Sequence, residues 1–501
     1  MLSLVLAVVS PCVSLAILIL LPAILLGVLQ SIRRKYFAYP TRLKIAIFHP
    51  YCIGGGGGER VLWVLVHALL RDLPLNSDIS IFTGDRWVTD EAIYKHVEQK
   101  FSISIDPDQR NKIHFIRISS RFLLEAKWYP VFTMLFQSLA SMVIGLECLV
   151  YFQPHLLVDT IGCPFIYPIF KVFGACAEII AYIHYPIISS DMLEEVANPR
   201  PNHSNAYKPP SFWFLFKSRF KILYYRGFAL LYGLIGYFAD VAVVNSSWTE
   251  GHIRHLWWMN KQIVKVFPPC NTNSLVQMDI SRERSRTILS VGQFRPEKDH
   301  FLQISSFRMF QLKYPQYSDV ELVIIGGTRN AQDLEFVKEL FNFSRKYCHG
   351  DTCQLFRETS DEGGGLNREI GKIRFIVDAE FSTLMHFLSV ASIGLHTMWN
   401  EHFGISLVEM MAAGLIVVAH NSGGPKLDIV GDIFNEGAAY LASSAEEYAE
   451  SFHKILSTTT DKIPKLRLAA RTSAKRFSDS HFSTAMVEIV VNSFTRIKKY
   501  R

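Results

Sequence analysis

The stretch from Leu43 to Arg60, with the sequence LKIAIFHPYCIGGGGGER, sets the expectation for the fold. Its first six residues form a short apolar run rich in β-formers, and a helical pattern of apolar residues extends from Glu59 to Leu70. Five consecutive glycines, Gly54–Gly58, stand between the two. An apolar run, a glycine turn and a helix in this order predict the first strand, loop and helix of a parallel α/β sheet.

The same alternation continues along the chain, stops once and then starts again. Pro268, Pro269 and the polar stretch to Arg286 make the break, which predicts a linker between two domains. The strands predicted before it are residues 43–48, 79–82, 113–116, 156–158, 179–183 and 241–244. Those predicted after it are residues 287–291, 321–325, 373–377, 392–396 and 416–419. The expected units are two Rossmann-like α/β domains, residues 40–268 and 285–480, followed by a helix over residues 481–501. Ligands of such sheets bind beyond the carboxyl ends of the strands.

The composition describes a large folded protein without a strong charge bias. The chain has 501 residues, 49% of them hydrophobic and 19% charged, and its mean hydropathy is +0.17. It is long enough for full-sized cores and too polar for a transporter with many spans. The net charge of +7 suits phosphate or anionic lipid and gives no reason to expect nucleic acid. The eight cysteines show no C-x-x-C spacing, which indicates a reduced compartment.

Residues 1–32 contain no charged side chain, and their apolar run is long enough to span a bilayer. Three basic residues, 33–35, follow directly. Because positive charge marks the cytoplasmic end of a span, we expect one anchor with its N-terminus outside or in the lumen and the rest of the chain in the cytoplasm. A cleaved signal peptide is the alternative, although its basic residues normally come first. Two further apolar stretches, 131–152 and 223–244, carry charges and predict buried or interfacial helices rather than spans.

The five glycines are the first candidate for ligand binding. Gly55, Gly56 and Gly57 lie at a strand–helix junction, where a backbone without side chains can approach a phosphate closely. A flexible turn is the alternative, but a run of glycines is costly in conformational entropy unless a ligand requires close approach. No G-K-[ST] follows, so the run is not a P-loop.

The second domain offers charged residues at the ends of two predicted strands. Arg295 and Lys298 follow the strand at 287–291, and this basic pair suits a diphosphate, with a solvated loop as the alternative. Glu401 and Glu409 follow the strand at 392–396, and carboxylates can accept hydrogen bonds from the vicinal hydroxyls of a sugar. Gly404 permits close approach at the start of a helix, where free N–H groups can hold phosphate oxygens. Together these residues predict a site for a sugar nucleotide.

Two patterns raise the question of a metal. Asp106-Pro-Asp108 matches the D-x-D of metal-dependent sugar transferases, but its polar surroundings favour a turn. Cys348, His349 and Cys353 lack the fourth ligand of a structural zinc site. We expect no metal and no cofactor other than the co-substrate.

The spacing of Glu401 and Glu409 resembles the E-x7-E motif of the family 4 retaining glycosyltransferases. The resemblance covers nearly the whole chain after the anchor and implies the GT-B fold. Longer strings are similar to the eukaryotic GDP-mannose-dependent α-1,2-mannosyltransferases of the dolichol-linked oligosaccharide pathway, which add the fourth and fifth mannoses. These strings are His49–Arg60, Val244–Thr249, Gly292–Lys298, His396–Gly404 and His420–Asp428.

The resemblance implies a role for each candidate residue. Glu401 contacts the donor hexose and Glu409 the ribose, while the backbone of Phe403, Gly404 and Ile405 faces the donor. Arg295 and Lys298 neutralise the diphosphate without a metal. His184, at the end of the strand at 179–183, matches the family's histidine beside the transferred sugar, although a strand-end histidine can also be purely structural. Many members carry Arg where this chain has Gln293, so the contact of Arg295 is an open question.

The implied function is a retaining transfer of mannose from GDP-mannose to a dolichol-diphosphate-linked oligosaccharide during N-glycan precursor assembly. The implied location is the cytoplasmic face of the endoplasmic reticulum membrane, which is compatible with a complex with other mannosyltransferases of the pathway. The residues alone leave open another sugar nucleotide, another lipid acceptor, or a non-catalytic membrane subunit with the same fold. Tyr207–Phe228, rich in aromatic and basic residues, is the predicted membrane contact, with a core helix as the alternative.

Overall fold

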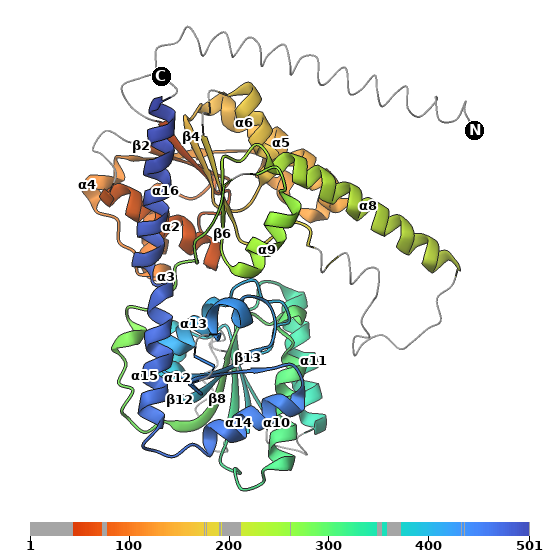
Figure 1. Ribbon diagram of the computed structural model, residues 1–501, viewed down its shortest axis with the longest axis vertical. Coiled ribbons are helices and arrows are strands. Elements are labelled where there is room, and N and C mark those ends of the chain that lie inside the picture. The colour runs from red at the N-terminus through yellow and green to blue at the C-terminus, as the bar shows by residue number, and fades with distance from the viewer. Residues whose placement is uncertain are drawn as a thin grey trace. The chain divides into compact units, whose positions relative to one another are not determined.

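The structure is a computed structural model and describes residues 44–72, 78–174, 176, 178–189, 192, 212–260, 262–347, 353–357, 372–431, 433–434 and 436–499. The chain divides into two compact units. The N-terminal unit comprises residues up to Asn245, Thr249–Val266 and the chain from Ser483. The C-terminal unit comprises Ser246–Trp248 and Phe267–Phe482. Figure 1 shows the elements of each.

The described part of the N-terminal unit contains a seven-stranded parallel sheet in the order β3-β2-β1-β4-β5-β6-β7. Its strands are β1 (Lys44–Phe48), β2 (Asp78–Thr83), β3 (Ile113–Arg117), β4 (Leu156–Asp159), β5 (Glu178–Ile183), β6 (Val241–Val244) and β7 (Ile263–Lys265). Its helices are α2 (Gly57–Asp72), α3 (Asp90–Phe101), α4 (Pro107–Arg110), α5 (Thr133–Tyr151), α6 (Tyr167–Phe173), α8 (Phe212–Gly236), and most of α9 (Ser247–Leu256) and of α16 (Asp479–Lys499). Three short 3-10 helices are η1 (Ser120–Leu124), η2 (Ala126–Trp128) and η3 (Pro164–Ile166).

The described part of the C-terminal unit contains a second seven-stranded parallel sheet, in the order β10-β11-β9-β8-β12-β13-β14. Its strands are β8 (Ser285–Val291), β9 (Glu321–Gly326), β10 (Cys353–Arg357), β11 (Ile373–Val377), β12 (Ala391–His396), β13 (Ile416–His420) and β14 (Ala439–Ala442). Its helices are α10 (His300–Lys313), α11 (Ala331–Tyr347), α12 (Phe381–Val390), α13 (Ile405–Ala412), α14 (Ala445–Leu456) and α15 (Ile463–Ala474). Shorter helical turns are η4 (Leu275–Gln277), η5 (Pro296–Lys298), η6 (Pro425–Ile429) and η7 (Lys475–Phe477).

Every strand predicted from an apolar run is present, which confirms the expectation of two parallel α/β sheets. Sequence analysis missed β7, β10 and β14, and all three lie at the edge of a sheet. An edge strand pairs on one side only and is buried less, so its sequence has less need of a continuous apolar run.

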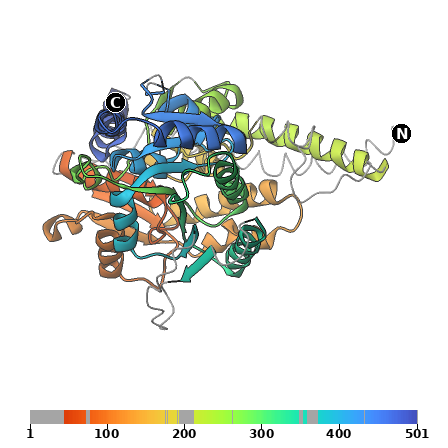
Figure 2. The same cartoon turned by 90° about the horizontal axis from the view of Figure 1, so that it is seen from below.

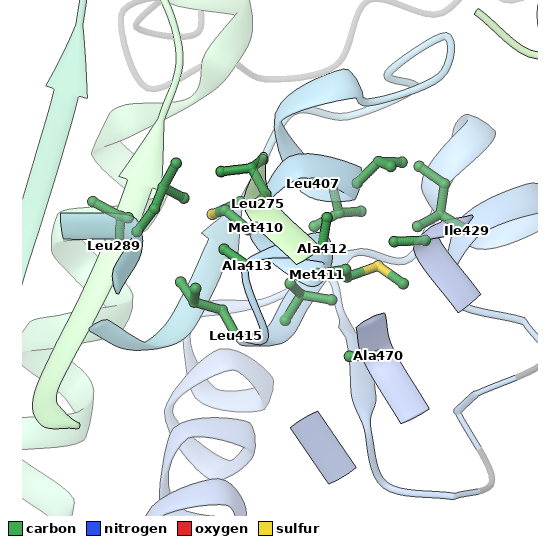
Figure 3. Close-up of a cluster of buried hydrophobic side chains, with 14 of the residues drawn as sticks. Leu275, Leu289, Leu407, Met410, Met411, Ala412, Ala413, Leu415, Ile429 and Ala470 are labelled. Atoms are coloured by element: carbon green, nitrogen blue, oxygen red, sulfur yellow. The ribbon is translucent and has the colours of Figure 1, made fainter. Parts of the chain in front are cut away.

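The start of α13 is fixed by a hydrophobic core beneath it. Four apolar residues of α13 are all buried: Leu407, Val408, Met410 and Met411. Figure 3 shows Leu407, Met410 and Met411 in one cluster with Leu275, Leu289 and Ile429, so the helix packs against several segments of the C-terminal unit. Burying such side chains stabilises the unit by about 1.5–3 kcal/mol each, which holds the helix N-terminus in place.

The predicted anchor, residues 1–32, lies outside the described residues. Among the residues that are described, α5 is the helix long and apolar enough to cross a membrane, by length and composition alone. Its stretch was predicted to form a buried or interfacial helix. One face of α5 is buried against η1, η3 and α6, and the other is exposed.

Candidate functional site

Lys298 and Glu401, the central pair of the predicted site, meet in the C-terminal unit. Lys298 ends η5, just beyond β8, and its Nζ lies 2.5 Å from Oε2 of Glu401, in the loop between β12 and α13. Thr397 holds the backbone beneath this pair, because its hydroxyl donates to the carbonyl of Lys298 at 2.8 Å. The residues predicted to bind diphosphate and hexose are therefore neighbours, although 103 positions separate them in the sequence.

Glu401 is ionised in this environment. Burial alone would raise the pKa of its carboxyl, but a hydrogen bond from His396 and the positive charge of Lys298 hold that pKa well below its usual range. His396 ends β12, and its Nε2 lies 3.3 Å from Oε2 of Glu401. A carboxylate can only accept, so Nε2 carries the proton and donates. The site thus keeps a carboxylate that accepts hydrogen bonds from hydroxyls.

His396 was missed as a site residue by sequence analysis. Its place at the carboxyl end of a predicted strand was the available signal, and that signal is weak because many buried histidines end strands. The side chain is 5% exposed and its Nδ1 has no hydrogen-bond partner among the described residues. A buried histidine that donates a hydrogen bond to Glu401 fixes the orientation of that carboxylate.

Arg295 lies on the same loop as Lys298 but has a different partner. Its guanidinium forms an ion pair with Glu297, and both side chains are partly exposed. Gln293, at the position where many family members carry Arg, is exposed, and its carbonyl accepts a hydrogen bond from His300 Nε2 at 3.2 Å. The ammonium of Lys298, rather than the guanidinium of Arg295, therefore pairs with Glu401.

Gly404 forms the N-cap of α13 with a φ of 112°, a conformation that strains any residue with a side chain. Phe403 is buried before it, and Ile405 begins the helix. The first N–H groups of a helix have no partner within the helix, so they are free to bind an anion. Glu409 lies within the same helix and is half-buried.

Gly423 and Gly424 pack against the backbone of the Glu401 loop. Gly423 has a φ of 60°, and a Cβ on it would lie 2.3 Å from the carbonyl oxygen of Glu401. Gly424 donates its N–H to that same oxygen at 2.8 Å. Ser422 accepts from the N–H of Asn400 at 2.8 Å. Sequence analysis gave these residues no role, although two glycines directly after a predicted strand are a signal of close backbone approach.

In the N-terminal unit the glycine run and His184 come together. Gly57 begins α2, and the N–H of Gly56 donates to Glu59 Oε2 at 3.0 Å. His184 follows β5, and its Nε2 donates to the carbonyl of Thr160 at 2.9 Å. A Cβ on Gly58 would lie 3.7 Å from the same Nε2, so the histidine ring borders the glycine loop. The glycine loop and His184 lie close together because they follow β1 and β5, and the carboxyl ends of parallel strands lie on the same side of the sheet.

A buried histidine, His49, contacts the same threonine as His184. His49 Nδ1 lies 2.8 Å from the hydroxyl of Thr160, which itself donates to the carbonyl of Phe48 at 3.2 Å. Burial, and after it the charge of His184, lowers the pKa of His49 to about 3. His49 is therefore neutral at physiological pH and connects β1 to β4 through Thr160.

The Asp106-Pro-Asp108 motif caps a short helix. Asp106 is the N-cap of α4, and its carboxylate accepts from the N–H of Asp108 at 3.0 Å. This is the local role that its polar surroundings favoured. Within the described part of the chain, no group of three or more His, Cys, Asp or Glu is arranged to hold a metal ion. Cys348 and His349 lie outside that part.

Comparison with known families identifies both halves of the chain. Residues 42–257 match the family described as "ALG11 mannosyltransferase N-terminus", and residues 366–477 match "Glycosyl transferases group 1". The GDP-Man:Man(3)GlcNAc(2)-PP-Dol alpha-1,2-mannosyltransferase of Homo sapiens is 39% identical over 459 residues, which cover 91% of this chain and 88% of the relative. The protein of the same name from Caenorhabditis elegans is 37% identical, over 88% and 89%.

Solved structures support the fold alone. An alpha,alpha-trehalose 6-phosphate synthase from Burkholderia multivorans aligns with a TM-score of 0.61 at 11% identity, covering 91% of this chain and 100% of that one. A glycosyltransferase from Rickettsia africae aligns with a TM-score of 0.55 at 16% identity, covering 91% and 99%. These likenesses confirm the GT-B class expected from the sequence.

Proposed function

The chain belongs to the family of GDP-Man:Man(3)GlcNAc(2)-PP-Dol alpha-1,2-mannosyltransferases, and we propose that it works through the residues at the carboxyl ends of its two sheets. It is an enzyme that transfers mannose from GDP-mannose to a dolichol-linked oligosaccharide in α-1,2 linkage. The observation that supports the residue roles is the Lys298–Glu401 ion pair close to the glycine-capped start of α13. A cation, a carboxylate and helix N–H groups suit the diphosphate and hydroxyls of a sugar nucleotide.

Lys298 binds the diphosphate in this proposal. In the free protein its ammonium is neutralised by Glu401. A bound diphosphate competes for the ammonium and leaves a carboxylate oxygen of Glu401 available to a mannose hydroxyl. Positive charge beside the departing phosphate lowers the barrier to cleavage of the bond between sugar and phosphate. Arg295 adds a second positive charge once the donor replaces Glu297 as its partner.

Glu401 and Glu409 accept hydrogen bonds from the hexose and the ribose respectively. His396 keeps the Glu401 carboxylate ionised and oriented. The backbone of Phe403, Gly404 and Ile405 faces the donor phosphates at the start of α13. Each of these contacts uses a group that the fold holds in place before the donor arrives, so little reorganisation is needed on binding.

The N-terminal unit contributes the glycine loop and His184. Gly55 and Gly57 present backbone N–H groups to the donor, and Gly56 does so once the donor replaces Glu59 as the partner of its N–H. His184 lies beside the transferred sugar. Because its Nε2 is tied to the carbonyl of Thr160, the tautomer of His184 is fixed with the proton on that nitrogen. Residues 40–268 then receive the acceptor and residues 285–480 hold the donor nucleotide.

Transfer proceeds with retention of anomeric configuration. The acceptor hydroxyl attacks the anomeric carbon from the face that GDP leaves. The bond between the anomeric carbon and the phosphate oxygen of GDP breaks, and the hydroxyl proton passes to the departing phosphate. The enzyme adds the fourth and then the fifth mannose. Residues 1–32 anchor it in the endoplasmic reticulum membrane, with both units in the cytoplasm, where it can form a complex with other mannosyltransferases of the pathway.

The test is transfer by the purified full-length chain to a lipid-linked trimannosyl acceptor. Radiolabel from GDP-mannose is expected in two added residues that an α-1,2-mannosidase releases, and label from UDP-sugars is not. Incorporation from a UDP-sugar would support the alternative of another donor. Binding of GDP-mannose without turnover would support a non-catalytic subunit and overturn the roles proposed for Glu401 and Lys298.

A further inference from the structure

The exposed side of α5 carries an uninterrupted apolar stripe. Its members follow the helical spacing of four and three residues, from Phe132, 41% exposed, to Val150, 84% exposed. Such a stripe covers one face of a helix and is about 27 Å long at 1.5 Å per residue. We call it the α5 stripe, and it consists of Phe132, Phe136, Leu139, Val143, Leu146 and Val150.

The opposite face of α5 is attached to the N-terminal unit, so the helix lies on the surface. Glu147, the sole acidic residue of α5, accepts from the N–H groups of Ser119 and Ser120 at 2.7 and 2.9 Å. Gln137 donates to the carbonyl of Leu124. Gly145 allows close packing, since a Cβ there would meet Ile166 and Ile169 at 3.3–3.4 Å. A helix held by these contacts is a surface element, not a span.

Helix α8 extends the apolar surface and adds positive charge. Tyr224 stacks edge-on against Phe132 at 5.1 Å, and its hydroxyl accepts from the N–H of Leu135 at 3.1 Å. Figures 1 and 2 show α5 and α8 together on one flank of the N-terminal unit. Lys221 and Arg226 are exposed on α8, as is Lys127 before α5. Further apolar side chains exposed on α8 are Leu223, Leu230 and Leu234, and Tyr237 is exposed directly after the helix.

We propose that the α5 stripe lies in the interfacial layer of the lipid bilayer, parallel to its plane, with the basic residues of α8 at the headgroups. An apolar face flanked by exposed basic residues matches an anionic membrane surface rather than a second apolar protein face. The inference rests on the proposed function, because a dolichol tail stays in lipid and its diphosphate must reach the enzyme there. Most of the predicted contact Tyr207–Phe228 lies outside the description, namely residues 207–211 and the side chains of residues 212–220. Phe228, at its end, is buried and stacks on Phe165, so the α5 stripe is a membrane contact additional to that segment.

The first experiment identifies what covers the stripe. The full-length chain carries p-benzoylphenylalanine in place of Leu139, Val143 or Val150 and is reconstituted in phosphatidylcholine vesicles with phosphatidylinositol. Illumination is expected to give lipid adducts at these positions. Matched controls are Leu312 and Leu468, which are 62% and 54% exposed in the C-terminal unit and are expected to give none. A crosslinked dimer, or an adduct with residues 1–43 of the same chain, would overturn the proposal.

The second experiment asks what the stripe does for the reaction. The triple variant Leu139→Gln, Val143→Gln, Leu146→Gln is expected to raise the KM for a vesicle-bound lipid acceptor at least tenfold. The KM for GDP-mannose stays unchanged, as does turnover of a short-chain acceptor in detergent. Leu312→Gln is the control. An unchanged KM for the vesicle-bound acceptor would overturn the inference, whereas a wild-type chain that transfers to neither acceptor would overturn the proposed function instead. If the triple variant does not fold, the crosslinks at single positions still decide.

Discussion

Glu401 is the residue on which the contacts of the C-terminal unit converge. Its carboxylate meets Lys298 and His396, and its backbone carbonyl accepts from Gly424. The same carboxylate is neutralised by Lys298 in the free protein and is required for a sugar hydroxyl in the proposed complex. In the proposed complex the diphosphate replaces Glu401 as the ionic partner of Lys298, and the Glu401 carboxylate accepts hydrogen bonds from His396 and a sugar hydroxyl.

The two glutamates of the motif differ in surroundings, and their replacement should have different effects. Glu401→Ala is expected to lower kcat ten- to a hundredfold, because a hydrogen bond to a charged group contributes about 1.5–3 kcal/mol. Glu409→Ala, on the half-buried side of α13, should mainly weaken GDP binding. Steady-state kinetics and GDP titration measure both. Exposed Glu488→Ala is the control, and near-wild-type turnover of Glu401→Ala would contradict the assignment.

His396 should act through Glu401 and leave a signature in the pH profile. Its hydrogen bond helps to lower the pKa of Glu401, so His396→Ala raises that pKa. The acid limb of the kcat profile is then expected to move to higher pH, with kcat about tenfold lower at neutral pH. His396→Gln, which keeps a donor, should restore much of the loss. An equal fall in activity at all pH values, without rescue by Gln, would show a structural role only.

The ionisation of Glu401 makes the free energy of unfolding depend on pH in a direction that follows from its lowered pKa. The pKa of Glu401 in the folded state lies below its ordinary value of 4.5, so the carboxylate stabilises the fold above pH 4.5. That contribution is lost as the pH falls from there toward the lower folded-state value. His396→Ala should therefore lose less stability than the wild type between neutral pH and pH 3, as measured by urea unfolding.

In the proposed complex, Lys298 and Arg295 supply the positive charge that a metal ion supplies in metal-dependent transferases. Transfer is therefore expected to persist in excess EDTA, measured with radiolabelled GDP-mannose and a lipid-linked acceptor. Lys298→Met should lose most activity, and added Mn²⁺ should not restore it. If EDTA abolishes transfer and Mn²⁺ returns it, the basic residues do not carry the diphosphate and Asp106 and Asp108 become candidates again.

At the scale of elements, the loop after β13 packs closely against the loop after β12, and a glycine makes this close contact possible. A Cβ on Gly423 would lie 2.3 Å from the Glu401 carbonyl, and its φ of 60° already disfavours a side chain. Gly423→Ala is expected to displace the Glu401 loop, lower the free energy of unfolding by about 1–3 kcal/mol and reduce transfer at least tenfold. Thermal unfolding and activity measure the two effects.

The control for this change is another glycine to which nothing is close. Gly251 lies within α9, and a Cβ on it would meet nothing within 4 Å. Because alanine favours a helix over glycine, Gly251→Ala should raise the free energy of unfolding by about 1 kcal/mol and leave transfer unchanged. Equal losses in Gly423→Ala and Gly251→Ala would show that the loop contact has no special importance.

At the scale of the whole molecule, α16 belongs to both units. It begins at Asp479 in the C-terminal unit, and from Ser483 it packs with the N-terminal unit. Near its end, Arg496 donates to both oxygens of Glu178 at 3.1 and 3.0 Å, and Glu178 is buried at the start of β5. A paired donor geometry of this kind holds the last turns of the helix against the sheet.

Removing Arg496 should leave a buried carboxylate without its cation. Arg496→Ala is expected to lower the free energy of unfolding by about 2 kcal/mol, less than for a fully buried pair because Arg496 is one-third exposed. Urea unfolding measures it. Arg286→Ala, whose pair with Asp319 is exposed on both sides, should cost less than about 1 kcal/mol. If both variants lose the same amount, the Glu178 pair does not secure α16.

The sequence by itself determined the central strands and pointed to the candidate residues of the site. A strand buried on both faces needs a continuous apolar run, so β1, β4, β8 and β12 were visible as such runs. The glycine run and the two glutamates were visible because the proposed roles, close backbone approach and hydroxyl binding, each restrict the residue type at fixed spacing. These are local constraints, which is why a linear pattern can carry them.

Only the tertiary structure decided which residues meet. The spacing of residues in the sequence does not say that Lys298 pairs with Glu401 or that His396 donates to it. Nor does it give the partner of Arg295 or the close contact of Gly423 with the Glu401 loop. The edge strands β7, β10 and β14 depend on a neighbour already in place. The exposure of the α5 stripe depends on which face the rest of its unit covers. Contacts between distant segments arise from packing the sheets and helices together, and packing depends on the whole chain at once.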